Sequence, residues 1–284
     1  MNTNRRITLL LALLLFAAVG VNAQDAPRAA AVGPIINPTS FPGQFWNDTG
    51  NVSPTEHNDV ISASYFEQGV TIFRLGDNAA QQFTITPYVA LGVTADTQGF
   101  DWNNRIQMNA GGRLNKYVST HGIAGIVSLG GAYSYEDRWI GNEKKGGLTG
   151  EVTYWFGWNM LGDPKSRFPG STWGAAGYLT PVEAHNFIYM QYFKQGVVAH
   201  RFNAHNAIVP FGEITTSVDT KHYDWENKIM PGGGVEFVHL HGNTQTELGA
   251  EYLYEHRWES GLQGAQATIF LKFWFGWNPI RGRK

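Results

Sequence analysis

The sequence contains no cysteine and few charged residues. Without cysteine, disulfides cannot hold the chain together as they do in many small exported domains. Charged residues make up 15% of the chain, against roughly 25% in an ordinary soluble domain. The formal net charge is −2, which gives no support to nucleic-acid binding, because that function needs a basic surface. We therefore expect no nucleic-acid partner.

Long apolar runs are also missing after the N-terminus. There, Arg5 and Arg6 precede the apolar run ITLLLALLLFAAVGV, which ends in the small-x-small sequence Val21-Asn22-Ala23. This is the pattern of a secretory signal peptide, so we expect cleavage after Ala23. The alternative is a retained anchor helix, but the run is shorter than the roughly 20 residues that a membrane span needs. No later stretch is long enough for a transmembrane helix.

Glycine and aromatic residues are abundant, with 34 Gly, 10 Trp, 12 Tyr and 17 Phe. An exported chain of this composition is typical of a transmembrane β-barrel, in which apolar residues facing lipid alternate with polar residues facing the lumen. Near the C-terminus, Ile269, Leu271 and Phe273 alternate with Thr268 and Lys272. Such alternation extends over more than ten residues in several segments. Strands of globular proteins are usually about 5–6 residues long, whereas membrane strands need about 9–11, so the length favours a membrane.

Several blocks of the sequence occur twice in the same order. YWFGWN returns as FWFGWN, FPGQFW as FPGSTW, YFEQGVTIFR as YFKQGVVAHR, DTQGFDWNN as DTKHYDWEN, and YEDRW as YEHRW. The repeat is about 120 residues long, which exceeds the length of solenoid and propeller units. An internal duplication of this kind produces either two domains or two halves of one closed sheet, and the continuous strand pattern favours one sheet.

Each copy contains at least five candidate strands, and a division of the first one at Gly69 would give six. In the first copy these segments lie near residues 58–76, 83–96, 106–118, 122–138 and 147–159. Six strands per copy keep both copies in the same orientation across the membrane, whereas five would invert the second copy. We predict an all-β fold, a single transmembrane antiparallel β-barrel of about twelve strands, with ten as the alternative. The expected divisions are a signal peptide (1–23), a leader or plug (24–57), a first half-barrel (58–160) and a second half-barrel (161–284).

At this level the chain resembles the outer-membrane β-barrel proteins of Gram-negative bacteria. The resemblance covers nearly all of the mature sequence and rests on architecture, not on a family-specific motif. In its paired Tyr-Glu-x-Arg and Phe-Gly-Trp-Asn blocks, the chain also resembles barrels associated with exopolysaccharide export. The basic tail NPIRGRK after Trp277 departs from the aromatic chain end that is common in outer-membrane barrels. The resemblance implies a location in the cell outer membrane, in contact with its lipids.

Charged residues on the polar parity of the strands are predicted to face the lumen, because Arg or Lys facing lipid at mid-depth costs about 2–4 kcal/mol. One interpretation is a selectivity lining for a polar or sugar-like solute. The other is an ion-pair network that fills a narrow lumen, since twelve strands lie between filled eight-stranded and open sixteen-stranded barrels. The candidates are Arg74, Glu136, Arg138, Glu151, Arg201, Glu213, Glu251, Glu255, Arg257 and Lys272.

Aromatic residues near the strand ends are predicted to form a girdle at the lipid headgroups. The alternative is the buried aromatic core of a soluble sandwich. Two of these residues, Trp102 and Trp225, fall in expected loops, where they would anchor the loop at the membrane interface or stack on a sugar ring. The full set is Trp102, Phe156, Trp158, Trp225, Phe275 and Trp277.

Three classes of function fit this pattern. The first is a passive or solute-selective channel, or a barrel associated with a surface polymer. The second is a receptor or structural barrel with a plugged lumen, and the third is a lipid-modifying enzyme. The spacing of the nine histidines reveals no Ser-His-acid set, so we expect no enzymatic activity, and likewise no metal site and no cofactor. The expected partners are outer-membrane lipids together with a polysaccharide or a small polar solute.

Overall fold

The computed structural model describes residues 35–51, 53–56, 59–76, 82–120, 122–163 and 165–278. The expected signal peptide and the start of the expected leader lie outside these residues. Among these residues, two 3-10 helices occur, η2 (Asp101–Asn103) and η3 (Asp224–Glu226). In the described part of the chain, no helix has the length and apolar character needed to cross a membrane. The strands are β1 (Ile35–Ser40), β2 (Gly43–Asn51), β3 (Ile61–Gly69), β4 (Thr71–Leu75), β5 (Phe83–Asp96), β6 (Arg105–Thr120), β7 (Ile123–Arg138), β8 (Glu143–Trp158), β9 (Gly170–Tyr178), β10 (Ile188–Gly196), β11 (His200–Arg201), β12 (Asn206–Asp219), β13 (Lys228–His241), β14 (Thr244–Arg257) and β15 (Gln263–Trp277).

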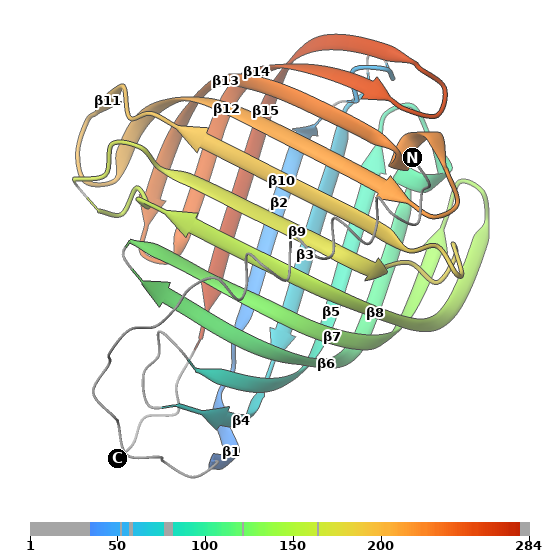
Figure 1. The fold of residues 1–284 in the computed structure, drawn as a ribbon, viewed down its shortest axis with the longest axis horizontal. Coiled ribbons are helices and arrows are strands. Elements are labelled where there is room, and N and C mark those ends of the chain that lie inside the picture. The colour runs from blue at the N-terminus through green and yellow to red at the C-terminus, as the bar shows by residue number, and fades with distance from the viewer. Residues whose placement is uncertain are drawn as a thin grey trace, which may run out of the picture. The chain divides into compact units, whose positions relative to one another are not determined.

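Twelve of these strands close into one antiparallel barrel (Figure 1). The ring runs β2-β3-β5-β6-β7-β8-β9-β10-β12-β13-β14-β15 and returns to β2. The last and first strands of the ring pair from Leu271 opposite Thr49 to Trp277 opposite Gly43. The prediction of a single closed barrel is therefore confirmed, with twelve strands and not ten.

The position of the first barrel strand corrects the expected division of the chain. Residues 43–51, placed inside the expected leader, form β2, which lies between β15 and β3 in the ring. The alternation of apolar and polar residues could not reveal this strand. The sequence of β2, GQFWNDTGN, places polar residues on both faces of the strand. The first half of the barrel therefore begins at Gly43.

The expected break at Gly69 exists, but it does not add a strand to the barrel. On either side of this break, β3 and β4 pair with the same neighbour, β5. The Gly69 amide donates to the carbonyl of Pro42 at 2.7 Å, and the Val70 amide donates to that of Pro87 at 2.9 Å. Gly196 and Val197 make the same two bonds to Pro169 and Pro210 in the second half. The sixth strand of the first half is thus β2.

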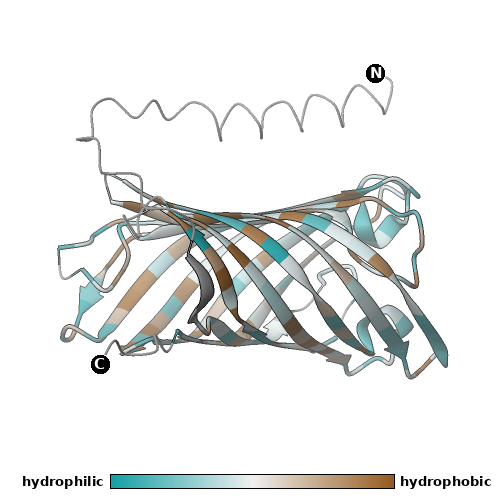
Figure 2. Cartoon of the chain, turned by 90° about the horizontal axis from the view of Figure 1, so that it is seen from below, coloured by the Kyte–Doolittle hydropathy of each residue, from teal (hydrophilic) through white to brown (hydrophobic). Residues whose placement is uncertain are grey.

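Side chains alternate between the two surfaces of the wall, and Figure 2 shows apolar and polar residues interleaved along the strands. On β5, Thr84 and Thr86 are buried, whereas Val89 is 56% exposed and Leu91 is 40% exposed. On β15, Phe270 is buried and its neighbour Ile269 is 73% exposed. An apolar outer surface around a polar interior, with every barrel strand paired on both sides, is the arrangement that a lipid environment requires. The chain is therefore a closed antiparallel β-barrel with the side-chain pattern of a membrane-spanning one.

The strand connections lie at two ends of the barrel. We call the end where β2 begins and β15 finishes the terminus end, and the opposite one the far end. The far end holds the connections β2–β3, β5–β6, β7–β8, β9–β10, β12–β13 and β14–β15. The helices η2 and η3 lie in the β5–β6 and β12–β13 connections, which are diametrically opposite in the ring.

Candidate functional site

The centre of the lumen in the first half holds one arginine between two carboxylates. Arg113 on β6 donates to Glu67 on β3, and its Nη2 lies 3.2 Å from Oε1 of Glu151 on β8. Its guanidinium also lies 4.1 Å from the centre of the Tyr88 ring, where a cation is attracted by the π-electrons. Every charge in this group has an opposite charge beside it.

The corresponding place in the second half has the charges exchanged. In the sequence repeat, Lys194 corresponds to Glu67, and Glu236 corresponds to Arg113. Lys194 forms an ion pair with Glu236, and its Nζ lies 3.1 Å from Oε2 of Glu247. The same two strand positions therefore hold an ion pair of opposite polarity.

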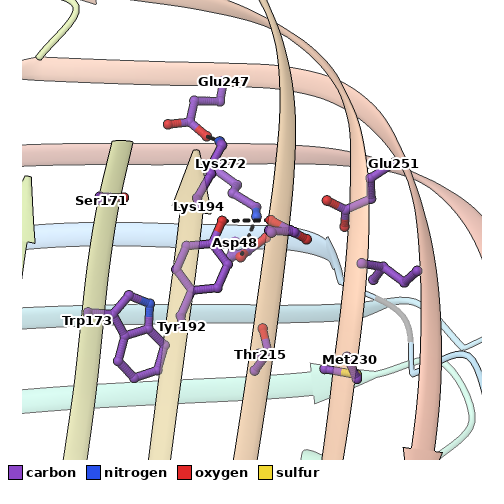
Figure 3. A pocket seen from close by; sticks show the side chains of 12 residues that line it. Asp48, Ser171, Trp173, Tyr192, Lys194, Thr215, Met230, Glu247, Glu251 and Lys272 are labelled. Atoms are coloured by element: carbon purple, nitrogen blue, oxygen red, sulfur yellow. Dashed lines mark hydrogen bonds and ion pairs between the residues drawn. The ribbon is translucent and has the colours of Figure 1, made fainter. Parts of the chain in front are cut away.

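A cavity of about 260 Å³ lies beside this second group (Figure 3). Four carboxylates and two lysines line it: Asp48, Glu213, Glu247, Glu251, Lys194 and Lys272. Trp173 and Tyr192 form an aromatic part of the wall, with ring centres 6.3 Å apart. A smaller cavity of about 170 Å³ shares Asp48, Glu247 and Lys272. We call the larger one the central cavity.

The two lysines do not neutralise all the carboxylates of the central cavity. Lys194 is held between Glu236 and Glu247, and Nζ of Lys272 lies 3.7 Å from Oδ2 of Asp48. Within the described residues, neither Glu213 nor Glu251 forms an ion pair within 4.0 Å. Glu213 accepts a hydrogen bond from the Tyr192 hydroxyl at 2.7 Å. The central cavity therefore has more carboxyl groups than lysines.

At the far end, Glu136 and Arg138 of β7 hold the β9–β10 connection inside the barrel. Nε of Arg138 donates to Glu136 at 2.8 Å, and its Nη2 donates to Glu183 at 2.7 Å. Thr180 donates to the other oxygen of Glu136, which is fully buried. We call this group, with Asp101 at 4.0 Å from Arg138, the first latch.

The second latch repeats these contacts with residues of β14 and the β2–β3 connection. Nε of Arg257 donates to Glu255 at 2.9 Å, and its Nη2 donates to Glu56 at 2.7 Å. Ser53 donates to Glu255, as Thr180 does to Glu136. Asp224 lies 3.6 Å from Arg257 and completes the group. In both latches an arginine ties an inward loop to the wall.

A stack of aromatic rings lies between the two latches, across the opening of the barrel at the far end, which we call the mouth. Trp102 of η2 lies against Trp225 of η3, with ring centres 5.1 Å apart and planes inclined by 4°. Phe100 stacks on Trp102 at 4.9 Å, and Tyr223 stacks on Trp225 at 4.8 Å. Since η2 and η3 come from opposite sides of the ring, these four rings span the far end.

The contact between Trp102 and Trp225 was not predicted from the sequence, and their anchoring at the membrane interface stays a prediction. Each indole covers a face of the other at the far end. Alternation could not reveal this contact, because both residues lie in loops and their partners are far apart in the sequence.

The other aromatic candidates lie on the outer surface of the terminus end. Trp158 donates to Gln195 at 2.9 Å, and Trp277 donates to Gln68 at the same distance. Phe156 contacts Tyr154, and Phe275 contacts Trp277. An aromatic girdle at this end stays a prediction.

The predicted lumen residues fall into three groups. Glu151, Glu213, Glu251 and Lys272 surround the centre, whereas Glu136, Arg138, Glu255 and Arg257 form the latches. Arg201 lies at the terminus end, where it donates to the carbonyl oxygens of residues 161, 163 and 166 and holds the β8–β9 connection. Arg74 is opposite Thr84 in the sheet, so its side chain shares the inward parity.

Sequence reasoning missed several charged partners. Arg113, Lys194 and Glu236 lie on the polar parity of β6, β10 and β13, and that parity was the available signal. They were overlooked because the two copies carry opposite charges there. Glu56 and Glu183 lie in connections, where no alternation points to them.

Comparison with known proteins identifies no family for this chain. No protein-family model matches it, and no curated protein does. Among solved structures, an outer-membrane channel from Pseudomonas putida F1 aligns with a TM-score of 0.45 and 6% identity, covering 89% of this chain and 100% of the other. The beta domain of the Bordetella autotransporter BrkA aligns with a TM-score of 0.41 and 9% identity, covering 84% and 99%. Likenesses this distant say nothing about the activity of this chain.

Proposed function

We propose that the protein is a cation-preferring solute channel of the outer membrane, closed at its far end in the state described here. The observation that carries this proposal is the excess of carboxylates around the central cavity. A network that only fills the lumen would place a cation beside every carboxylate, as Arg113 lies beside both Glu67 and Glu151, because a buried charge without a partner is costly. Ionisable groups kept inside a membrane protein at such a cost usually serve an ion or solute pathway.

The decisive experiment is conductance of the purified, folded protein in a planar bilayer. We expect single-channel currents that prefer cations, because the carboxylates attract them and repel anions. The double variant Glu213→Gln/Glu251→Gln removes two of these charges and should weaken the preference. Glu259→Gln is the matched control, since this acid lies exposed in the β14–β15 connection and not in the lumen.

A plugged interaction barrel is the second candidate, and the latches and the aromatic stack favour it. The double variant Trp102→Ala/Trp225→Ala separates the two proposals, because it removes the rings that span the far end. A channel should then conduct more, or begin to conduct. Silence of the wild type and of this double variant, both demonstrably folded, would reject the channel and leave the plugged barrel. A phospholipid-hydrolysis assay on the same preparations tests the enzyme alternative.

A further inference from the structure

We propose that the central cavity is a binding site for a small organic ammonium ion. This inference rests on the proposed function, for which it names the class of solute. Its starting point is Glu251, which is 5% exposed and whose carboxylate points into the cavity (Figure 3). Among the described residues, its Oε2 has no hydrogen-bond partner. A buried acceptor without a partner costs free energy, so a bound donor would be favoured there.

The positions of the two lysines indicate that the bound hydrogen-bond donor should carry a positive charge. Lys194 is shared by two carboxylates and Lys272 lies 3.7 Å from Asp48, so neither Glu213 nor Glu251 has an ion pair within 4.0 Å among the described residues. One further positive charge between these two residues would complete the pairing. The chain already places ammonium groups in this part of the lumen, so the surroundings are suited to one more.

The surroundings favour an organic cation over a metal ion. In the part of the chain that the structure describes, no group of three or more His, Asp or Glu side chains is arranged to hold a metal. Instead, Trp173 and Tyr192 present aromatic rings to the cavity, and Nζ of Lys272 lies 5.9 Å from the centre of the Tyr192 ring. Aromatic rings attract ammonium groups and pack against the carbon atoms attached to them. Carboxylates with aromatic rings therefore point to an alkylammonium group.

The two carboxylates without an ion pair have no acidic counterpart in the first half of the barrel. The residues that correspond to Glu213 and Glu251 in the sequence repeat are Ala90 and Ala132, and both are buried. On that side the charges of Glu67, Arg113 and Glu151 are paired with one another. The described part of the barrel thus offers one site of this kind, so binding should show a single class of site.

The test is calorimetric titration of the detergent-solubilised full-length protein with butylammonium chloride. Butanol and sodium chloride at equal concentration are the controls, since the first lacks the charge and the second lacks the carbon chain. We expect saturable binding of one butylammonium ion and none of butanol. Glu251→Gln should weaken the binding at least tenfold, whereas Glu151→Gln, a lumen carboxylate paired with Arg113, should leave it unchanged.

The titration is repeated in the Trp102→Ala/Trp225→Ala background, so that a closed mouth cannot hide the site. Heat-modified migration in gels checks that each variant is folded. Absence of saturable binding in both backgrounds, or equal binding by the folded Glu251→Gln variant, would overturn the inference. Binding is measured without a membrane, so the two proposals can fail separately. Binding without conductance would reject the channel but keep the ammonium site. Conductance without binding would keep the channel but reject the ammonium site.

Discussion

The indole rings of Trp102 and Trp225 lie almost parallel, with centres 5.1 Å apart, although the two residues come from opposite sides of the barrel. Each ring is covered on its other face by Phe100 or Tyr223. The adjacent Asp101 and Asp224 face Arg138 and Arg257 of the two latches. The stack and the latches therefore form one connected closure of the far end.

Replacing Trp102 with alanine should remove an optical signal of this contact. Two stacked indoles couple their transitions and give a paired band in the ultraviolet circular dichroism spectrum, which the variant should lose. An aromatic pair contributes about 0.5–1.5 kcal/mol beyond its buried area, so the barrel should stay folded. Trp139→Ala is the control, because this residue is exposed in the β7–β8 connection. If Trp102→Ala keeps the paired band, the indoles do not stack in solution.

Arg138→Met should destabilise the barrel far more than the loss of an exposed ion pair. The variant leaves Glu183 buried without its cation and Glu136 with Arg105 alone, whose Nη1 lies 3.6 Å from Oε1 of Glu136. Breaking a buried pair in this way costs about 3–5 kcal/mol. Unfolding in lipid vesicles by guanidinium, followed by tryptophan fluorescence, measures the difference. Lys144→Met, which breaks an exposed pair with Asp137, should change the stability little, because solvent screens such pairs. Equal losses in the two variants would show that the first latch is not buried.

Asp59 gives the β2–β3 connection a pH dependence that its counterpart lacks. Burial, and then the negative charge of Asp96, raises the pKa of Asp59 above its usual value. When the pKa of a carboxyl is higher in the folded state than in the unfolded state, protonation of that carboxyl stabilises the folded state. The connection should therefore gain stability as the pH falls through the folded-state pKa. It should lose this gain again at neutral pH. Hydrogen exchange of the connection, corrected for the intrinsic rate at each pH, measures the effect.

The sequence repeat supplies the control for this prediction, because Asn186 occupies the corresponding position in the β9–β10 connection. Asp59→Asn resembles the protonated form, so it should raise protection severalfold at neutral pH and change little in acid. The reciprocal variant Asn186→Asp should introduce a pH dependence into the second connection. If the protection against hydrogen exchange depends on pH equally in the wild type and in Asp59→Asn, another group causes the effect.

The alternation of residues was sufficient to predict the barrel wall. Each wall strand has a lipid side and a lumen side, so the two-residue period identified β5, β7 and β15 and placed Glu251 and Lys272 inside. It failed for β2, in which neither face is consistently apolar. There the repeated FPG-x-x-W block was the better signal, since its second copy, residues 168–173, includes the start of β9.

The closure of the far end could not be predicted from periodicity. Glu56 and Glu183 lie in connections, and their partners Arg257 and Arg138 lie on strands that are distant in the sequence. Likewise, a search for identical residues in both copies finds Arg138 and Arg257 but passes over Arg113, whose counterpart is Glu236. An ion pair of reversed polarity has the same physical role, so comparing charge pairs between the copies would have found it.

Residues 35–160, expressed alone, should form a two-fold homodimer with twelve strands. The β8–β9 and β15–β2 seams have the same register, because Trp158 is opposite Gly170 and Trp277 is opposite Gly43. The β8 edge of one copy could therefore pair with the β2 edge of the other. A single half-barrel would leave both edges unpaired in lipid, which is strongly unfavourable.

Sedimentation in density-matched detergent measures the mass of this fragment. Gly43→Val is the matched control, because a Cβ atom at Gly43 would overlap the ring of Trp277 in the full chain, as one at Gly170 would overlap that of Trp158. In the dimer, valine at this position would collide with Trp158 of the other copy and should prevent assembly. A folded monomer, or a dimer that tolerates Gly43→Val, would contradict the equivalence of the two seams. It would also remove the structural support for reading the sequence repeat as two interchangeable halves of one barrel.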